Sequence, residues 1–133
     1  MLALAISPDG SKAVAAGMDD DHYVAVLDLK SGNILAKQKG GKKVIMKLGW
    51  ISNDEFVSVG IRHFKYWTFD GKLTGRDGNN PVYFVSLAIG SDKTVLTGAS
   101  HGTIYNWKGN SGRLAVTLKK PFVPINKDDE FNE

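Results

Sequence analysis

The sequence predicts an all-β fold made of about three four-stranded antiparallel blades of a β-propeller. A strand pattern recurs three times, the repeat is close to 40 residues long, and apolar and polar side chains alternate within each unit. A period of about 40–45 residues with several short strands per period is typical of propeller blades. A helical repeat of that length would instead place apolar residues three and four positions apart.

Each unit consists of a polar turn, a short apolar strand and an alternating, often aromatic strand. The polar turns are SPDG (7–10), SND (52–54) and GSDK (90–93); the strands after them are SKAVAAG (11–17), EFVSVG (55–60) and TVLTG (94–98); the next strands are YVAVLDL (23–29), HFKYWTF (63–69) and TIYNW (103–107). The glycine that closes the second strand falls at Gly17, Gly60 and Gly98, and a bulky residue of the third strand falls at Leu27, Trp67 and Trp107. These spacings place the three units in register.

We expect four strands in each unit, joined by turns rich in Gly, Asp, Asn and Ser. The first blade (about 1–43) has strands near 2–6, 12–17, 22–28 and 33–38, the second (about 44–81) near 44–50, 55–60, 62–68 and 72–75, and the third (about 82–120) near 82–89, 94–99, 103–107 and 113–118. Residues 121–133 match no part of the repeat. Two prolines and the run KDDE oppose a fourth blade there, so this segment is expected to be a non-repeat tail.

The composition is that of a folded globular protein, with 42% hydrophobic and 23% charged residues. The absence of cysteine excludes disulfides and thiolate metal sites, and fits the cytosol. No apolar run is long enough to cross a bilayer, so no membrane partner is expected. The net charge of +3 gives no reason to expect a nucleic-acid partner.

Three blades do not close a ring, because closed propellers have typically 4–8 blades. We therefore expect this chain to be a piece of a larger propeller. Blade faces left without a neighbour also predict self-association, most simply two chains that close a six-bladed ring. An open arc of three blades would leave unpaired strand edges and apolar faces in water. A solitary small β fold is the alternative.

The repeats resemble a known family. ISPDGSKAVAAG and VAVLDLKSGNILAK in the first unit, and the third unit, are similar to generic WD40 repeats, and VGIRHFKYWT (59–68) resembles the signature stretch of the echinoderm microtubule-associated protein-like (EMAP-like) family. In that stretch a strand ends in Val-Gly, a basic residue and His follow, and the repeat closes on an aromatic residue, Trp and Thr. The resemblance implies a WD40-type propeller segment of a cytoplasmic, cytoskeleton-associated protein that binds tubulin or microtubules. A general WD40 scaffold for other proteins, with no tubulin role, remains the alternative.

The sequence departs from ideal WD40 repeats at two motifs. The Trp-Asp dipeptide is replaced by Leu27-Asp28, Trp67-Thr68 and Asn106-Trp107-Lys108, and the Gly-His pair before the first strand is missing. The buried Asp–His–Ser–Trp hydrogen-bond network of such repeats is therefore not expected in full, which leaves hydrophobic packing and strand pairing. Trp67 and Trp107 are expected to pack between neighbouring blades, and Trp50 is expected to be buried as well.

No motif supports catalysis or cofactor binding. The chain has no Gly-x-Ser-x-Gly elbow, no phosphate-binding loop and no nucleophile with an oriented base, so we predict no enzyme activity, catalytic residue or cofactor. His22, His63 and His101 occupy the same turn of separate blades, too far apart to share a metal ion. The run Asp19-Asp20-Asp21 is best explained as a solvated turn.

The candidate partner-binding feature is basic. The run KQKGGKK (37–43) links the first blade to the second and contains Lys37, Lys39, Lys42 and Lys43 without an acidic residue. In a WD40-type propeller such links share one face with the turns between second and third strands, which adds Arg62, His63 and Arg76. This face could attract an acidic partner such as the acidic tails of tubulin, although the three aspartates at 19–21 would dilute its field. A lysine-rich loop that is merely solvated is the alternative.

Overall fold

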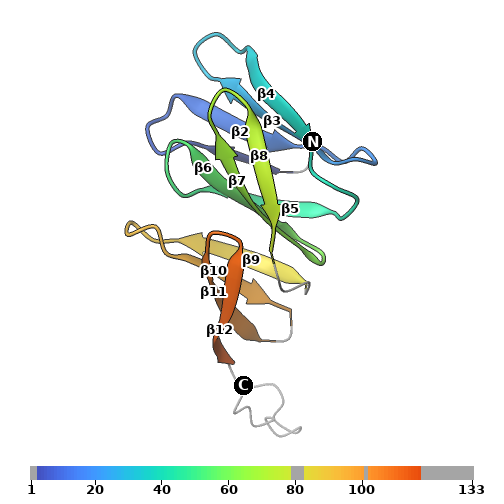
Figure 1. Ribbon diagram of the computed structural model, residues 1–133, viewed down its shortest axis with the longest axis vertical. Coiled ribbons are helices and arrows are strands. Elements are labelled where there is room, and N and C mark those ends of the chain that lie inside the picture. Colours follow the sequence, from blue (N-terminus) through green and yellow to red (C-terminus); the bar gives the residue numbers. More distant parts are fainter. Residues whose placement is uncertain (1–2, 79–82, 101, 118–133) are drawn as a thin grey trace, which may run out of the picture.

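The computed structural model describes residues 3–78, 83–100 and 102–117. All helices and strands assigned in these residues are of one kind, β-strands (Figure 1). The strands form three four-stranded antiparallel sheets that follow one another along the chain, which confirms the predicted fold class. These described segments include no helix that could span a membrane. The expected tail, residues 121–133, lies outside the described residues.

The strands differ from the predicted spans by at most two residues at either end. The first sheet contains β1 (Ala3–Ile6), β2 (Lys12–Ala16), β3 (Tyr23–Asp28) and β4 (Ile34–Lys39); the second contains β5 (Ile45–Trp50), β6 (Glu55–Gly60), β7 (His63–Phe69) and β8 (Leu73–Asp77); the third contains β9 (Phe84–Ile89), β10 (Val95–Ala99), β11 (Thr103–Lys108) and β12 (Ser111–Thr117). Neighbouring strands in each sheet are consecutive in the chain, so each sheet is a meander.

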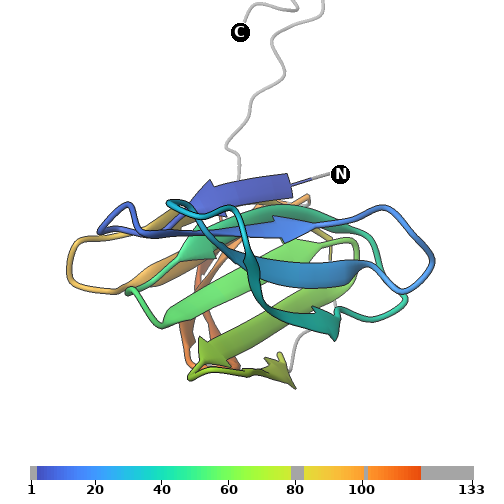
Figure 2. The same ribbon diagram turned by 90° about the horizontal axis from the view of Figure 1, so that it is seen from above.

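The three sheets are stacked as blades. Figure 1 shows them one after another along the long axis, and Figure 2, which looks along that axis, shows them overlapping face to face. The first strands of successive sheets lie together, with β1 against β5 and β5 against β9. The last strands form the outer edges of the sheets.

The strand register shows which residues of the three blades are equivalent. The bulky residues of the third strands each lie opposite one residue of the second strand, in the pairs Leu27 with Ala13, Trp67 with Phe56, and Trp107 with Val95. This confirms the repeat phase taken from the bulky residues. The glycine alignment was wrong in the third blade. Counted from these pairs, Ala99 is the counterpart of Gly17 and Gly60. Gly98 is instead the counterpart of Ala16 and Val59. The similar strand endings in the sequence hid this shift of one residue.

Each inner interface between blades uses the same two faces. The third-strand Trp face of one blade packs on the β-branched face of the blade before it. Between the first and second blades the buried core includes Val14, Val24, Val26, Phe56 and Trp67; between the second and third it includes Val57, Val59, Phe64, Phe84 and Trp107. All three tryptophans are at most 6% exposed, as expected, and Trp50 Nε1 donates a hydrogen bond to the carbonyl oxygen of Ala5 across the first interface.

The buried polar groups are paired more fully than the missing motifs indicated. Trp67 Nε1 donates to Ser58 Oγ at 3.0 Å, and Trp107 Nε1 donates to Thr97 Oγ1 at 2.8 Å. The expectation that only packing and strand pairing remain was therefore wrong for the second and third blades. In the first blade the register places Leu27 and Ala15 at these positions, so the pair is apolar there.

Candidate functional site

Two turns at one end of the blades bring the basic residues together. The link from β4 to β5 bends at Gly40, whose N–H lies 3.0 Å from the carbonyl oxygen of His22. A Cβ at Gly40 would collide with that oxygen, so the close approach requires glycine. Gly41 follows with a φ of 120°, which also favours glycine. The bend carries Lys42 away from the strand that holds Lys39.

The turn between β6 and β7 lies against this link. Ile61 N–H donates to the carbonyl oxygen of Val44 at 3.2 Å, and a Cβ on Gly60 would overlap the same oxygen. Arg62, at the tip of the turn, has a φ of 52° and an exposed side chain. The glycine thus allows the second-blade turn to approach the link between the blades.

The link, this turn and the end of β8 enclose a cleft of about 340 Å³, here called the basic cleft. Its charged lining consists of four cations, Lys42, Lys43, Arg62 and Lys65, and one carboxylate, Asp77. The cleft therefore has a positive balance on a molecule whose whole net charge is only +3.

The cations differ in how far they are neutralised. Lys42 Nζ lies 2.7 Å from Asp21 Oδ1, and this hydrogen bond lowers the pKa of Asp21 and raises the pKa of Lys42. Lys65 is mostly buried and lies 3.5 Å from Asp77 and 5.2 Å from the centre of the Trp67 ring. Among the described residues, Lys43 and Arg62 have no ion-pair partner, so their charges are available to a ligand.

His63 lines the cleft but is held by the core. Its ring is 5% exposed, and its Nε2 lies 2.7 Å from Ser58 Oγ, which also accepts the Trp67 N–H. Burial, reinforced by the Lys65 cation, lowers the pKa of His63 to about 4. The ring is consequently neutral at pH 7 and adds no charge to the cleft.

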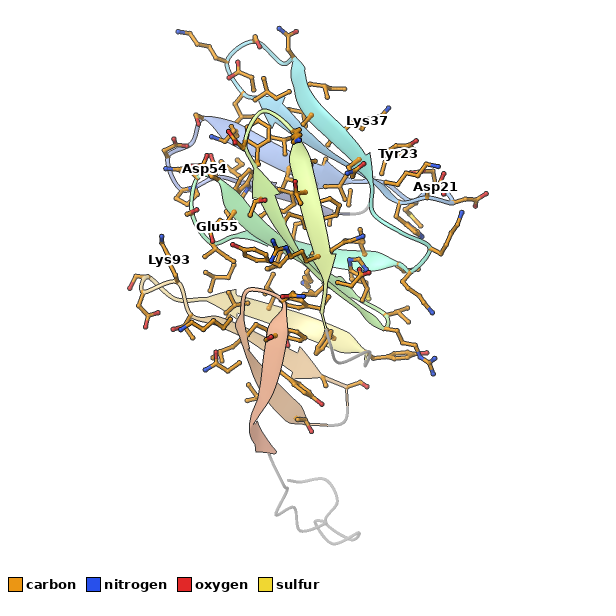
Figure 3. All side chains as sticks on the ribbon, viewed as in Figure 1. Asp21, Tyr23, Lys37, Asp54, Glu55 and Lys93 are labelled. Atoms are coloured by element: carbon orange, nitrogen blue, oxygen red, sulfur yellow. The ribbon has the colours of Figure 1, made fainter. Side chains whose placement is uncertain are left out.

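The structure thus gathers four of the seven predicted site residues, namely Lys42, Lys43, Arg62 and His63, and places the other three elsewhere. Lys37 Nζ lies over the Tyr23 ring at 4.9 Å, Lys39 Nζ lies 3.8 Å from Asp21, and Arg76 is exposed on β8 opposite Tyr66. Figure 3 shows Asp21, Tyr23 and Lys37 at one end of the first sheet.

Lys65 and Asp77 belong to the cleft but were missed from the sequence. Lys65 follows His63 by two residues in the same strand, and residues two apart in a strand share a face. That spacing could have identified it. Asp77 lies directly opposite Lys65 in the register of β7 and β8, which only the strand pairing reveals.

The opposite end of the blades carries two adjoining hollows. They measure about 460 and 590 Å³, and both are lined by Glu55 and Tyr66. Tyr66 O–H donates to Glu55 Oε1 at 2.8 Å, and burial followed by this hydrogen bond raises the pKa of Tyr66 to about 12. Figure 3 shows Glu55, Asp54 and Lys93 at the end away from Lys37.

No metal site is found among the described residues. They contain no group of three or more histidine and acidic side chains placed to hold an ion. His22 Nδ1 lies 3.2 Å from the carbonyl oxygen of Gly17, and His63 is hydrogen-bonded to Ser58. His101 lies outside the described residues.

Curated proteins with similar sequences are named for microtubules, cilia and flagella. The chain is 27% identical over 111 residues to the 77 kDa echinoderm microtubule-associated protein of Strongylocentrotus purpuratus, covering 77% of this chain and 16% of that protein. It is 28% identical to echinoderm microtubule-associated protein-like 3 of Mus musculus, covering 90% of this chain and 15% of that protein. It is also 28% identical to cilia- and flagella-associated protein 44 of Trypanosoma brucei brucei, covering 81% of this chain and 7% of that protein. The chain thus spans about a sixth or less of the length of these relatives. No family model matches it.

Solved structures with the same fold are WD40 propellers. The Cps50 (Swd1) β-propeller domain of Myceliophteria thermophila matches with a TM-score of 0.70 at 15% identity, over 90% of this chain and 41% of that one. The C-terminal WD40 domain of Sif2 matches with a TM-score of 0.64 at 18% identity, over 85% of this chain and 32% of that one. The chain is a partial WD40-type propeller that resembles EMAP-like proteins in sequence.

Proposed function

We propose that this chain is a non-enzymatic segment of a cytoplasmic, cytoskeleton-associated propeller, and that it binds tubulin in microtubules through the basic cleft. The cleft would receive an acidic, extended segment of the partner. The charged tails of tubulin have that character. The relatives named for microtubules support the choice of partner, and the geometry of the cleft supports the choice of surface.

The observation that carries the proposal is the charge balance of the cleft. Four cations and one carboxylate line it, and Lys43 and Arg62 have no ion-pair partner among the described residues. A concave surface of one sign attracts the opposite charge and raises the rate of encounter. Arg62 in addition offers a planar fork of donors that fits a carboxylate in two hydrogen bonds.

This mechanism makes binding depend on salt. The free cations are exposed, and interactions between exposed charges are screened over about 8 Å at physiological ionic strength. Affinity should therefore fall steadily as salt is added, whereas a contact dominated by apolar surface would change little.

Co-sedimentation of the whole chain with microtubules tests the proposal. We expect pelleting with intact microtubules at low salt, less pelleting at physiological salt, and loss of most of the signal with microtubules whose acidic tails have been removed. Equal pelleting with both kinds of microtubule would contradict a role for the tails. A chain that stays in the supernatant at low salt would contradict tubulin binding.

A general protein scaffold with no tubulin role is the second candidate, and the hollows around Glu55 and Tyr66 favour it. Their volumes suit the side chains of a bound peptide, and among the described residues the Glu55 carboxylate accepts hydrogen bonds only from the hydroxyls of Tyr66 and Ser52. Such a site would suit a basic peptide. Binding of a lysine-rich peptide that is lost in Glu55→Gln, together with failure to pellet with microtubules, would favour this candidate.

A further inference from the structure

Lys65 differs from the other three cations of the basic cleft because most of its side chain is buried. The side chain is 17% exposed, whereas Lys42, Lys43 and Arg62 are exposed. Its Nζ lies 5.2 Å from the centre of the Trp67 ring, and its stem passes β8 at Gly75, where a Cβ would come within 3.1 Å of Lys65 Cε. The glycine therefore leaves room for the stem between the strand and the cleft.

The contacts of the Lys65 ammonium group are long for a charged donor. Its Nζ lies 3.4 Å from the carbonyl oxygen of Gly40 and 3.5 Å from Asp77 Oδ1. Charge-assisted hydrogen bonds between an ammonium group and a carboxylate are about 2.7–2.9 Å long. Burial removes water from a cation, so a mostly buried cation without a short bond is costly. Among the described residues no other acceptor is closer, so the ammonium group can still form a short bond to an anion.

Asp77, the carboxylate nearest to Lys65, is itself exposed. Its side chain is 81% exposed, so it remains hydrated and gains little from the pair. It reaches Lys65 because the two residues are direct neighbours across β7 and β8. Rotation about the side-chain bonds of Asp77 opens the position beside Lys65 without moving a strand. A mostly buried cation thus has a weakly held partner that another carboxylate can replace.

We propose that Lys65 fixes the bound segment in the basic cleft by taking one carboxylate of the acidic partner, which displaces Asp77. The inference rests on the function proposed for the cleft and adds the group that holds the partner in place. The displaced group is a carboxylate, so the group that replaces it is an aspartate or glutamate side chain of the partner. Lys43 and Arg62, exposed in the cleft lining, hold further carboxylates of the same segment.

The exposed and the buried cations contribute to binding in different ways. Exposed charges attract the partner from a distance and act mainly on the association rate. An exposed pair adds little affinity, because water screens it and two long side chains lose freedom. A short bond to Lys65 is screened less, and packing already restricts the side chain that donates it. Loss of the Lys65 charge should therefore act mainly on the dissociation rate.

Fluorescence anisotropy of the whole chain with a labelled peptide of six glutamates, blocked at both ends, tests the inference at low salt. Lys65→Met keeps an unbranched stem beside Trp67 and should weaken binding at least about tenfold, mainly through faster dissociation. Asp77→Asn removes the competing carboxylate and should strengthen binding about two- to fivefold. The matched controls Lys72→Met and Asp70→Asn make the same charge changes in the exposed turn between β7 and β8, at the other end of these strands. They should bind within about twofold of wild type.

The double variant Lys65→Met with Asp77→Asn distinguishes exchange of the carboxylate from simple repulsion. If the partner takes the place of Asp77 beside Lys65, most of the gain from Asp77→Asn disappears once the Lys65 charge is removed. An undiminished gain in that background would overturn the inference. So would a folded Lys65→Met chain that binds like wild type, or Asp77→Asn without any gain. The tryptophans are buried, so a blue-shifted fluorescence maximum shows that each variant is folded.

Microtubule co-sedimentation of the same variants separates this inference from the proposed function. Pelleting that is unaffected by Lys65→Met would reject the role of Lys65 and leave tubulin binding in place. The expected peptide results without any pelleting would support the role of Lys65 and reject tubulin as the partner. A wild type that binds neither the peptide nor microtubules would overturn both.

Discussion

Trp107 Nε1 donates a hydrogen bond to Thr97 Oγ1 over 2.8 Å, and both residues are buried. The second blade repeats this arrangement with Trp67 and Ser58 and extends it to His63. An indole N–H buried between blades must find an acceptor, because an unpaired buried donor is costly. The hydroxyl therefore allows a tryptophan to fill the interface between two blades.

Thr97→Val should destabilise the protein by about 1–3 kcal/mol. The substitution keeps the shape of the side chain but leaves the Trp107 N–H without its acceptor. Urea unfolding at one fixed protein concentration, followed by tryptophan fluorescence, measures the loss. Thr74→Val, at an exposed position of β8, is the control and should change stability by less than about 0.5 kcal/mol. Equal effects of the two substitutions would mean that the hydrogen bond contributes nothing.

Stability should decrease on acidification between pH 6.5 and about 4 because of His63. Its pKa is lowered from 6.5 to about 4 by burial, so in this window the unfolded chain binds a proton that the folded chain does not. Stability is fully present above pH 6.5 and falls as the pH approaches 4, by up to about 3 kcal/mol. The aspartates with lowered pKa values, such as Asp9 at about 2, contribute only at lower pH.

His63→Gln separates this contribution from the others. Glutamine can still hydrogen-bond to Ser58 but does not titrate, so the slope of stability against pH between 6.5 and 4 should flatten. The measurement is the urea midpoint at several pH values in that window. If stability falls with pH at the same slope in wild type and variant, other groups cause the acid sensitivity.

Asp21→Asn should strengthen binding to microtubules at low salt, by roughly two- to fivefold. Asp21 pairs with Lys42 and lies near Lys39, so its neutralisation frees positive charge at the rim of the basic cleft. The Lys42 side chain is exposed and the Asp21 side chain lies at the surface, 30% exposed, so the substitution should change folding stability little. Co-sedimentation titrations at two salt concentrations measure the change, and the gain should shrink at the higher one. Weaker binding by this variant would contradict an electrostatic contact.

The sequence predicted the architecture well because repeat phase and alternation are local properties. The positions of Leu27, Trp67 and Trp107 placed all three blades. The error at Gly98 arose because two strand endings that look alike in sequence differ by one residue in register. The hydroxyl partners of the tryptophans were missed because they lie nine and ten residues away, on the neighbouring strand.

The candidate site was predicted only in part. The run of four lysines was treated as one loop, yet β4 extends through Lys39, and only the residues after the two glycines turn into the cleft. Of the three aspartates at 19–21, which were expected to dilute the field, Asp21 alone forms ion pairs among the described residues. Lys65 and Asp77 meet across two strands, a pairing that composition and charge runs do not encode.

The most direct test of the central claim compares two double variants in microtubule co-sedimentation. Lys43→Ser with Arg62→Ser removes the unpaired cations of the cleft, and Lys37→Ser with Lys39→Ser removes the same charge from the first sheet outside it. We predict that the cleft variant loses at least about tenfold in affinity, which corresponds to about 1.4 kcal/mol. The outer variant should bind nearly as well as wild type. Equal losses in the two variants would show that only net charge matters, and unchanged binding by the cleft variant would contradict the basic cleft as the binding surface.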